Sequence, residues 1–239
     1  NSMSELIDNC KRHVDEGWKF VRWHQPETSG TFLYQNNQNI LEPVESVALA
    51  EEQISIIRES LGPEIQICFD IHTRLDTAHA ISLCRAVEKF RPFFMEDPLR
   101  SENPASYRKL SRHVSVPIAA GEQWASKWPF REVIEEELIS YARIDLCIVG
   151  GLTEALKVTH SAETHYIVIV PHNPLGPVSA SACFVLCMAS TNVGVQEMPR
   201  RPGSYATDIF PKQIHWEGGY AWCHDELGMG VDMNEDVTM

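Results

Sequence analysis

Three acidic residues recur at a constant interval, and each follows a short apolar segment. Asp70 closes Ile-Cys-Phe-Asp, Glu96 closes Phe-Phe-Met-Glu and Glu122 closes Ile-Ala-Ala-Gly-Glu, with 26 residues from each acid to the next. Such apolar segments are typical of buried strands, and a helix-like stretch follows each acid. Repeated strand–helix units predict an α/β barrel, in which the three acids lie at the carboxyl ends of neighbouring parallel strands.

Three carboxylates at one edge of a sheet would repel one another unless a cation lay between them. None of the three positions is Cys or His, and carboxylate oxygens are the ligands that suit Mg²⁺. The sequence therefore predicts a divalent metal site, with Mg²⁺ as its ion and Asp70, Glu96 and Glu122 as its ligands.

The same alternation continues through most of the chain, and it predicts a parallel sheet with right-handed crossovers. Strands are expected over residues 19–24, 65–71, 93–95, 117–120, 140–144, 166–170 and 193–196. Helices are expected over residues 4–17, 44–61, 77–90, 104–113, 129–137, 153–164 and 177–189. A closed barrel needs one strand more than these, so we expect that strand to lie upstream.

Two segments depart from the alternation. The polar stretch 25–42 contains Pro26 and Gly30, and we expect a loop long enough to cover a site. Residues 200–239 are expected to form a polar extension outside the barrel, with Gly218-Gly219 as the turn of a hairpin over 213–222. The simplest organisation is one domain over residues 1–239.

The composition limits the partners that the chain can bind. With 239 residues, of which 44% are hydrophobic, the chain can bury the core of one α/β barrel domain. A formal net charge of −13, without a Lys/Arg-rich segment, argues against nucleic acid and against an anionic membrane surface. No apolar segment reaches the length of a membrane span, and the seven cysteines form no C-x-x-C motif. We therefore expect a soluble cytoplasmic protein with free thiols.

Further ionisable residues stand at the predicted strand ends. His72 lies two residues beyond Asp70, so in a strand it would face the same side as that acid. His172 and Asp145 end adjacent predicted strands, and contact between them would raise the basicity of the imidazole. Glu197 ends the last predicted strand. A single such acid is more often a helix cap or a surface residue, and His72 alone could equally be a packed imidazole.

Six short motifs resemble the enolase superfamily, mandelate racemase group, and within it the acid-sugar dehydratases of the galactonate and mannonate type. They are Phe-Asp-Ile-His at 69–72, Met-Glu-Asp-Pro at 95–98, Ala-Ala-Gly-Glu-Gln at 119–123, Arg-Ile-Asp at 143–145, Pro-His-Asn-Pro-Leu-Gly-Pro at 171–177 and Gln-Glu at 196–197. The resemblance implies a TIM-like (β/α)7β barrel, here without the N-terminal α+β capping domain of the family and without the first strand.

The resemblance also implies roles for the residues at the strand ends. Asp70, Glu96 and Glu122 would be the Mg²⁺ ligands. His172, supported by Asp145, would be the general base. By the same resemblance His72 would be the general acid, and Glu197 would hydrogen-bond the carboxylate of the substrate.

The strand predicted over residues 19–24, which corresponds to the second barrel strand of the family, departs from the racemase pattern. Racemases of the group carry a Lys-x-Lys pair there, whereas this chain has Arg22 and His24. Arg22 and Tyr34 resemble residues of the mannonate type, while Asp145 resembles the galactonate type, so the sugar acid stays open. We expect Arg22, His24 and Tyr34 to bind substrate.

The implied activity is a Mg²⁺-dependent hydro-lyase reaction that converts an aldonate such as galactonate, mannonate or gluconate into a 2-keto-3-deoxy sugar acid. A racemase or epimerase of the same superfamily is an alternative, and His24 would then be the second base. A third possibility is a catalytically impaired protein that binds a metal ion and a sugar acid, which the absence of a capping domain favours. Barrels of this group usually associate, so we expect a homo-oligomer.

Overall fold

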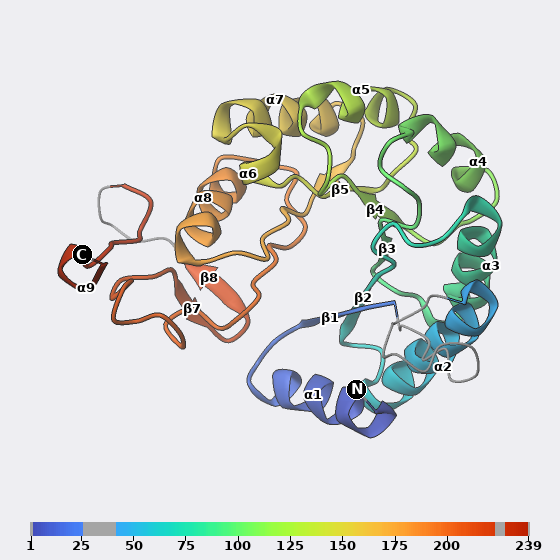
Figure 1. Cartoon of the computed structure of the whole chain (residues 1–239), viewed down its shortest axis with the longest axis horizontal. Helices are drawn as coiled ribbons and strands as arrows, with labels where there is room; N and C mark the ends of the chain where they lie inside the picture. Colours follow the sequence, from blue (N-terminus) through green and yellow to red (C-terminus); the bar gives the residue numbers. More distant parts are fainter. Residues whose placement is uncertain (1, 26–41, 223–227, 239) are drawn as a thin grey trace, which may run out of the picture. The chain divides into compact units, whose positions relative to one another are not determined.

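The computed structural model describes residues 2–25, 42–222 and 228–238, and the chain divides into two compact units (Figure 1). The N-terminal unit comprises Asn1–Ala120, and the C-terminal unit comprises Gly121–Met239. In each unit helices alternate with parallel strands, which is the α/β architecture that the sequence predicts. The single domain expected over residues 1–239 stays a prediction.

The strands of the N-terminal unit are parallel and follow one another in the order β1-β2-β3-β4. The elements of this unit are α1 (Met3–Asp15), β1 (Phe20–His24), α2 (Pro43–Leu61), β2 (Gln66–Asp70), α3 (Thr77–Val87), the 3-10 turn η1 (Glu88–Phe90), β3 (Phe94–Glu96), the 3-10 turn η2 (Pro104–Ser106), α4 (Tyr107–Ser111) and β4 (Ile118–Ala120). His24 pairs with Asp70 in the register, and Asp70 pairs with Glu96. The carboxyl ends of three strands therefore lie at one edge.

Apolar side chains hold the helices of this unit against its strands. Ile67 on β2 and Met95 on β3 are fully buried. Ala50, Ile54 and Ile57 on α2 are also fully buried, and their spacing places them on one face of the helix. Figure 1 shows α2 and α3 side by side along these strands. Burial of this shared apolar surface is the main stabilising term for a sheet covered by helices.

The beginning of α3 depends on a charged cap, which gives a testable prediction. The carboxylate of Asp76 accepts hydrogen bonds from the backbone N–H groups of Ala78 and His79, and it contacts the His79 ring at 2.6 Å. Replacing Asp76 with Ala should lower the free energy of unfolding by about 1 kcal/mol, measured by urea denaturation. Ser126, which caps α5 (Lys127–Glu135) without a side-chain hydrogen bond, is the matched control, and Ser126→Ala should cost much less.

The same cap should be sensitive to acid. The hydrogen bond to the His79 side chain, followed by those to backbone N–H groups, holds the pKa of Asp76 below its ordinary value. A carboxylate with a lowered pKa stabilises the fold above its unfolded-state pKa, and it loses this contribution as the pH falls through the lower folded-state pKa. The difference between the wild type and Asp76→Ala should therefore shrink below about pH 4. A difference that stays constant to lower pH would contradict a charged cap.

The C-terminal unit begins with the same alternation, which is followed by a hairpin and a short helix. Its elements are α5, β5 (Tyr141–Ala142), α6 (Leu146–Val149), α7 (Leu152–Glu163), β6 (Val168–Ile169), α8 (Pro177–Met188), β7 (His215–Glu217), β8 (Tyr220–Trp222) and α9 (Glu235–Thr238). Strands β5 and β6 are parallel, whereas β7 and β8 are antiparallel. Gly218 and Gly219, between β7 and β8, have φ angles of 60° and 85°, which confirms the predicted glycine turn.

Several predicted elements of the C-terminal unit are shorter in the structure. The strands expected over 140–144 and 166–170 are reduced to β5 and β6, and the strand expected over 193–196 is a single bridge between Val193 and Ile169. The short helix α6 was not predicted. It begins because the side chain of Asp145 accepts hydrogen bonds from the N–H groups of Cys147 and Ile148, so Asp145 is a helix cap as well as the end of a strand segment.

Gly121 is required where the chain leaves β4. Its φ is 129°, and a Cβ atom built on it would lie 2.4 Å from Cε1 of Phe130. Gly121→Ala should therefore lower the free energy of unfolding by about 1–3 kcal/mol through overpacking, in addition to backbone strain. Gly62 provides the control, since it also has a positive φ, 76°, but a Cβ atom added there would meet no heavy atom within 4 Å. Equal losses in Gly121→Ala and Gly62→Ala would rule out the steric explanation.

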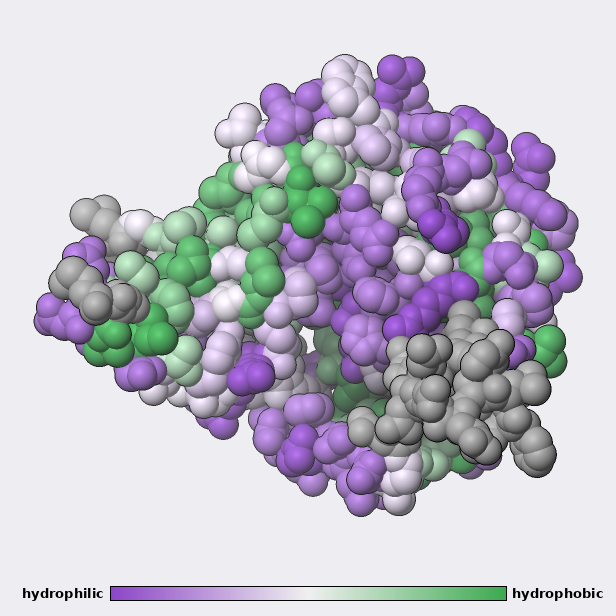
Figure 2. All heavy atoms as spheres, in the orientation of Figure 1, coloured by the Kyte–Doolittle hydropathy of each residue, from purple (hydrophilic) through white to green (hydrophobic). Residues whose placement is uncertain are grey.

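Part of the end of the chain packs on the C-terminal unit, while the polar extension expected over residues 200–239 stays a prediction. Ile214 is buried against Ala180 and Phe184 of α8, so part of this segment packs on the C-terminal unit. Tyr220 and Trp222 on β8 are 62% and 52% exposed, and Figure 2 shows hydrophobic surface on this unit. In the described ranges of the chain, no helix is long and apolar enough to span a lipid bilayer.

Candidate active site

Two buried acids and one arginine meet at the strand ends of the N-terminal unit. Asp70 on β2 and Glu96 on β3 have no exposed surface. Arg22 on β1 donates from Nη2 to Oδ2 of Asp70 at 2.8 Å and from Nε to Oε2 of Glu96 at 2.6 Å. A buried carboxylate is stable only when a cation or several donors compensate its charge, and the guanidinium fulfils this requirement for both acids.

Two histidines lie beside this group. Nδ1 of His24 is 2.7 Å from Oδ2 of Asp70, and the rings of His24 and His72 meet edge to face with centroids 5.8 Å apart. Burial by itself would raise the pKa of Asp70, but the hydrogen bond from His24 and the charges of Arg22, His24 and His72 outweigh burial and lower it. Asp70 is therefore ionised at neutral pH.

The backbone at His72 differs from the extended strand that the sequence analysis predicts. Strand β2 ends at Asp70, and His72 has a left-handed backbone with a φ of 56°, as does Thr73 with a φ of 60°. Strand alternation therefore does not extend to residue 72. Instead Oδ1 of Asp70 accepts a hydrogen bond from the backbone N–H of His72 at 2.7 Å, and this bond holds the turn.

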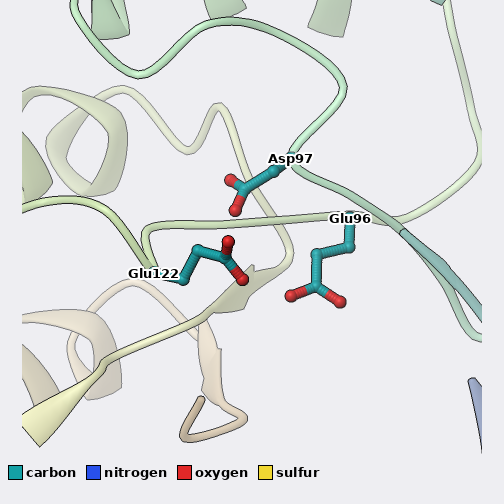
Figure 3. Close-up of side chains that lie close together, drawn as sticks. All are labelled: Glu96, Asp97 and Glu122. Carbon is teal, nitrogen blue, oxygen red and sulfur yellow. The ribbon is translucent and has the colours of Figure 1, made fainter. Parts of the chain in front are cut away.

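A further acid follows Glu96 directly. Asp97 is 4% exposed, and an oxygen of its carboxylate lies within 4.8 Å of an oxygen of Glu96. Figure 3 labels Glu96 and Asp97 of the N-terminal unit and Glu122 of the C-terminal unit, three buried acids of the kind that can supply oxygen ligands to a metal ion. The sequence analysis did not single out Asp97, although an acid between Glu96 and Pro98 was visible in the sequence.

In the C-terminal unit, His172 lies between two carboxylates. Its Nδ1 is 2.8 Å from Oδ2 of Asp145, and its Nε2 is 3.1 Å from Oε2 of Glu122. Asp145 and His172 also pair as a parallel bridge, so backbone pairing fixes the contact that the sequence predicts. Burial alone would raise the pKa of Asp145, but hydrogen bonds from His172, Cys147 and Ile148 outweigh burial and lower it. An ionised Asp145 favours a proton on Nδ1.

Glu197 belongs to a second buried charge pair of this unit. Its Oε2 accepts hydrogen bonds from Nη2 of Arg143 at 2.6 Å and from the backbone N–H of Asn173 at 3.0 Å. Arg143 is 1% exposed and also donates to the carbonyl oxygens of Val170 and Pro171. Arg143 was not predicted as a site residue, although an arginine inside the apolar segment Tyr-Ala-Arg-Ile was a signal for a buried ion pair.

The predicted site residues thus form one group in each unit. Arg22, His24, Asp70, His72 and Glu96 lie together in the N-terminal unit, whereas Glu122, Asp145 and His172 lie together in the C-terminal unit. Glu197 pairs with Arg143. Tyr34 falls outside the described residues, as does most of the loop expected over 25–42.

Curated relatives of the chain are named as D-galactonate and D-mannonate dehydratases. The chain is 29% identical over 242 residues to a D-galactonate dehydratase of Verminephrobacter eiseniae, a match that covers 99% of this chain and 61% of the relative. It is 34% identical over 184 residues to a D-mannonate dehydratase of Caulobacter vibrioides, which covers 76% of this chain and 45% of the relative. The chain therefore spans about half the length of these relatives.

The fold of the chain also resembles that of a solved structure. A crystal structure from Burkholderia SAR-1, described as a mandelate racemase/muconate lactonizing enzyme, matches with a TM-score of 0.88 and 26% sequence identity, covering 99% of this chain and 58% of that one. This match confirms the predicted fold class, an enolase-type α/β barrel. The family model described as enolase C-terminal domain-like matches residues 5–237. Because that model spans almost the whole sequence, the chain belongs to the enolase C-terminal domain-like family.

Proposed function

We propose that this chain is the barrel part of a Mg²⁺-dependent acid-sugar dehydratase. The reaction removes water from an aldonate and yields a 2-keto-3-deoxy sugar acid. One observation carries the proposal: Nδ1 of His172 lies 2.8 Å from an ionised Asp145, the arrangement of a general base with a fixed tautomer. The names of the relatives, galactonate and mannonate dehydratases, support this reaction class.

The metal ligands that we propose are Asp70, Glu96 and Glu122. The donor set fits a hard divalent cation, because all three are buried carboxylates. Oxygens of Asp70 and Glu96 also contact the Arg22 guanidinium, so a metal ion would share or replace that partner. Asp97 is a fourth candidate ligand. A bound magnesium ion would supply positive charge to the substrate carboxylate as the negative charge on it grows.

The proton transfers are assigned to two histidines. Nε2 of His172 takes the C2 proton. Nδ1 stays protonated and donates its hydrogen bond to Asp145, so the imidazole must be neutral before the reaction. Nε2 lies 3.1 Å from Glu122 in this structure, and it must exchange that contact for the substrate. His72 protonates the departing 3-hydroxyl, which leaves as water. The enol that results becomes the 2-keto product by tautomerisation.

The remaining residues bind and orient the substrate. Glu197, Arg22, His24 and Tyr34 are assigned to the carboxylate and hydroxyl groups of the aldonate. Glu197 is already anchored by Arg143 and Asn173, so this carboxylate approaches the substrate from a fixed position. We further propose that the protein acts as a homo-oligomer, as barrels of this group usually do.

The test is a panel of aldonic acids incubated with the protein and Mg²⁺, with keto-acid formation as the readout. We expect product from at least one member of the panel, and we expect EDTA to abolish it. If aldonates bind in the presence of Mg²⁺ but no member of the panel forms product, the result would favour the alternative of a metal- and sugar-acid-binding protein and would refute the dehydratase.

One observation favours a second reaction of the same superfamily. His24 contacts Asp70 at 2.7 Å, so the N-terminal unit also contains an imidazole–carboxylate pair, as a racemase or epimerase with two bases requires. In D₂O, an epimerase would return substrate with deuterium at C2 and inverted configuration. A dehydratase would return product without the inverted substrate, and the two outcomes are separated by NMR of the recovered sugar acids.

A further inference from the structure

Arg22 contacts both buried acids of the N-terminal unit that we assign to the metal. Its side chain is 21% exposed, whereas the side chains of Asp70 and Glu96 are fully buried. Nε and Nη2 each bind a different carboxylate, at 2.6 Å and 2.8 Å, so a single guanidinium bridges the two strand ends. A bridge of this kind uses the fixed planar geometry of Arg, which Lys does not reproduce.

The Arg22 bridge offsets the electrostatic cost of burying two carboxylates when no metal ion is bound. Two ionised carboxylates without solvent contact repel each other, and burial penalises both charges. The Arg22 guanidinium offsets that penalty. A divalent ion bound to the same two acids would offset it as well, so the two cations serve one purpose and repel each other at close range.

We propose that Arg22 is an internal counter-ion that competes with the divalent metal for Asp70 and Glu96. It stabilises the acids when no metal is bound, and it lowers the affinity of the site for the metal. The inference rests on the proposed assignment of these acids as metal ligands. Because coupling between two binding events is reciprocal, the metal must weaken the hold of Arg22 on the carboxylates by the same free energy.

The competition predicts opposite effects of one substitution on two measurements. Arg22→Met should increase the affinity for Mn²⁺ or Mg²⁺ by about tenfold or more, measured by isothermal titration calorimetry of the whole chain. In EDTA, the same variant should have a lower midpoint of thermal unfolding than the wild type. Added metal should raise the midpoint of the variant by more than it raises that of the wild type. Arg22→Gln, which is neutral but retains hydrogen-bond donors, provides a second test if Arg22→Met does not fold.

Two variants serve as controls. Arg22→Lys keeps the positive charge but cannot bridge both acids in the same way, so its affinity for the metal should lie between those of the wild type and Arg22→Met. Arg58→Met removes another arginine of the same unit, which donates to the backbone carbonyls of Phe90, Gly62, Ile65 and Arg91. It should lower the unfolding midpoint without changing the affinity for the metal.

The outcomes separate this inference from the proposed function. If the wild type binds the ion and the neutral variants bind it equally well or more weakly, Arg22 does not compete and the inference is wrong. If the wild type and both neutral variants fail to bind at millimolar concentrations, the assignment of the acids as a metal site fails first. Binding by the neutral variants alone would support the competition in its strongest form.

Discussion

Replacement of His172 with Asn is expected to abolish the exchange of the C2 proton with solvent and to reduce keto-acid formation by about 10²- to 10⁴-fold. Asn has no group that can accept the C2 proton, although it approximates the size of the imidazole and its polarity. The exchange is measured by NMR as deuterium incorporation in D₂O, and product formation is followed in parallel. Both should fall together, because one proton transfer governs them.

His160→Asn is the matched control for this experiment. His160 is an exposed residue on α7 of the same unit, so the change of residue type is identical while the proposed base is intact. We expect wild-type exchange and turnover in this variant. Turnover at the wild-type level in His172→Asn would remove His172 as the base. Loss of turnover with retained exchange would assign it to the later step.

The largest expected effect on stability comes from Arg143. Arg143→Met should lower the free energy of unfolding by about 3–5 kcal/mol, because it removes a cation from the partly buried Glu197 and a donor from two backbone carbonyls. Met fills much of the volume of the arginine side chain, so a cavity contributes little. Urea denaturation at neutral pH measures the loss.

An exposed ion pair of the same unit provides the comparison. Arg131 contacts Glu135 on α5, with side chains 64% and 54% exposed, and Arg131→Met should change stability by less than about 0.5 kcal/mol. The double variant of Arg143→Met with Glu197→Gln should recover part of the loss, because it removes both charges. A loss in Arg143→Met no greater than that in Arg131→Met would show that burial does not make this pair important.

The sequence was sufficient to predict the features that depend on local pattern. The acids at the ends of β2 and β3 follow from apolar segments of strand length, and the turn at Gly218-Gly219 follows from the conformational freedom of glycine. The contact of His172 with Asp145 was also predicted, since neighbouring parallel strands end at the same edge. These features need only periodicity and strand order.

Features that depend on long side chains were not predictable in the same way. The guanidinium of Arg22 reaches two strands, and nothing in the residues around position 22 indicates that it bridges Asp70 and Glu96. The helix α6 was missed because it begins with a side-chain cap at Asp145, a residue that also pairs with His172 as the end of a strand segment, and periodicity does not reveal such a cap. Local sequence pattern predicts helices and strands better than it predicts which side chains contact one another.

Asp145 uses its two oxygens for different tasks, and this matters for anyone who mutates the position. Oδ1 holds the first turn of α6, while Oδ2 faces the imidazole of His172. An alanine scan would therefore misread this residue, since truncation confounds a folding defect with a chemical one. Asparagine can still accept the hydrogen bond at the start of α6, but it lacks the charge that faces the imidazole. Asp145→Asn therefore tests the support of the base separately from the folding of α6, and it is a poor starting point for redesigning that base.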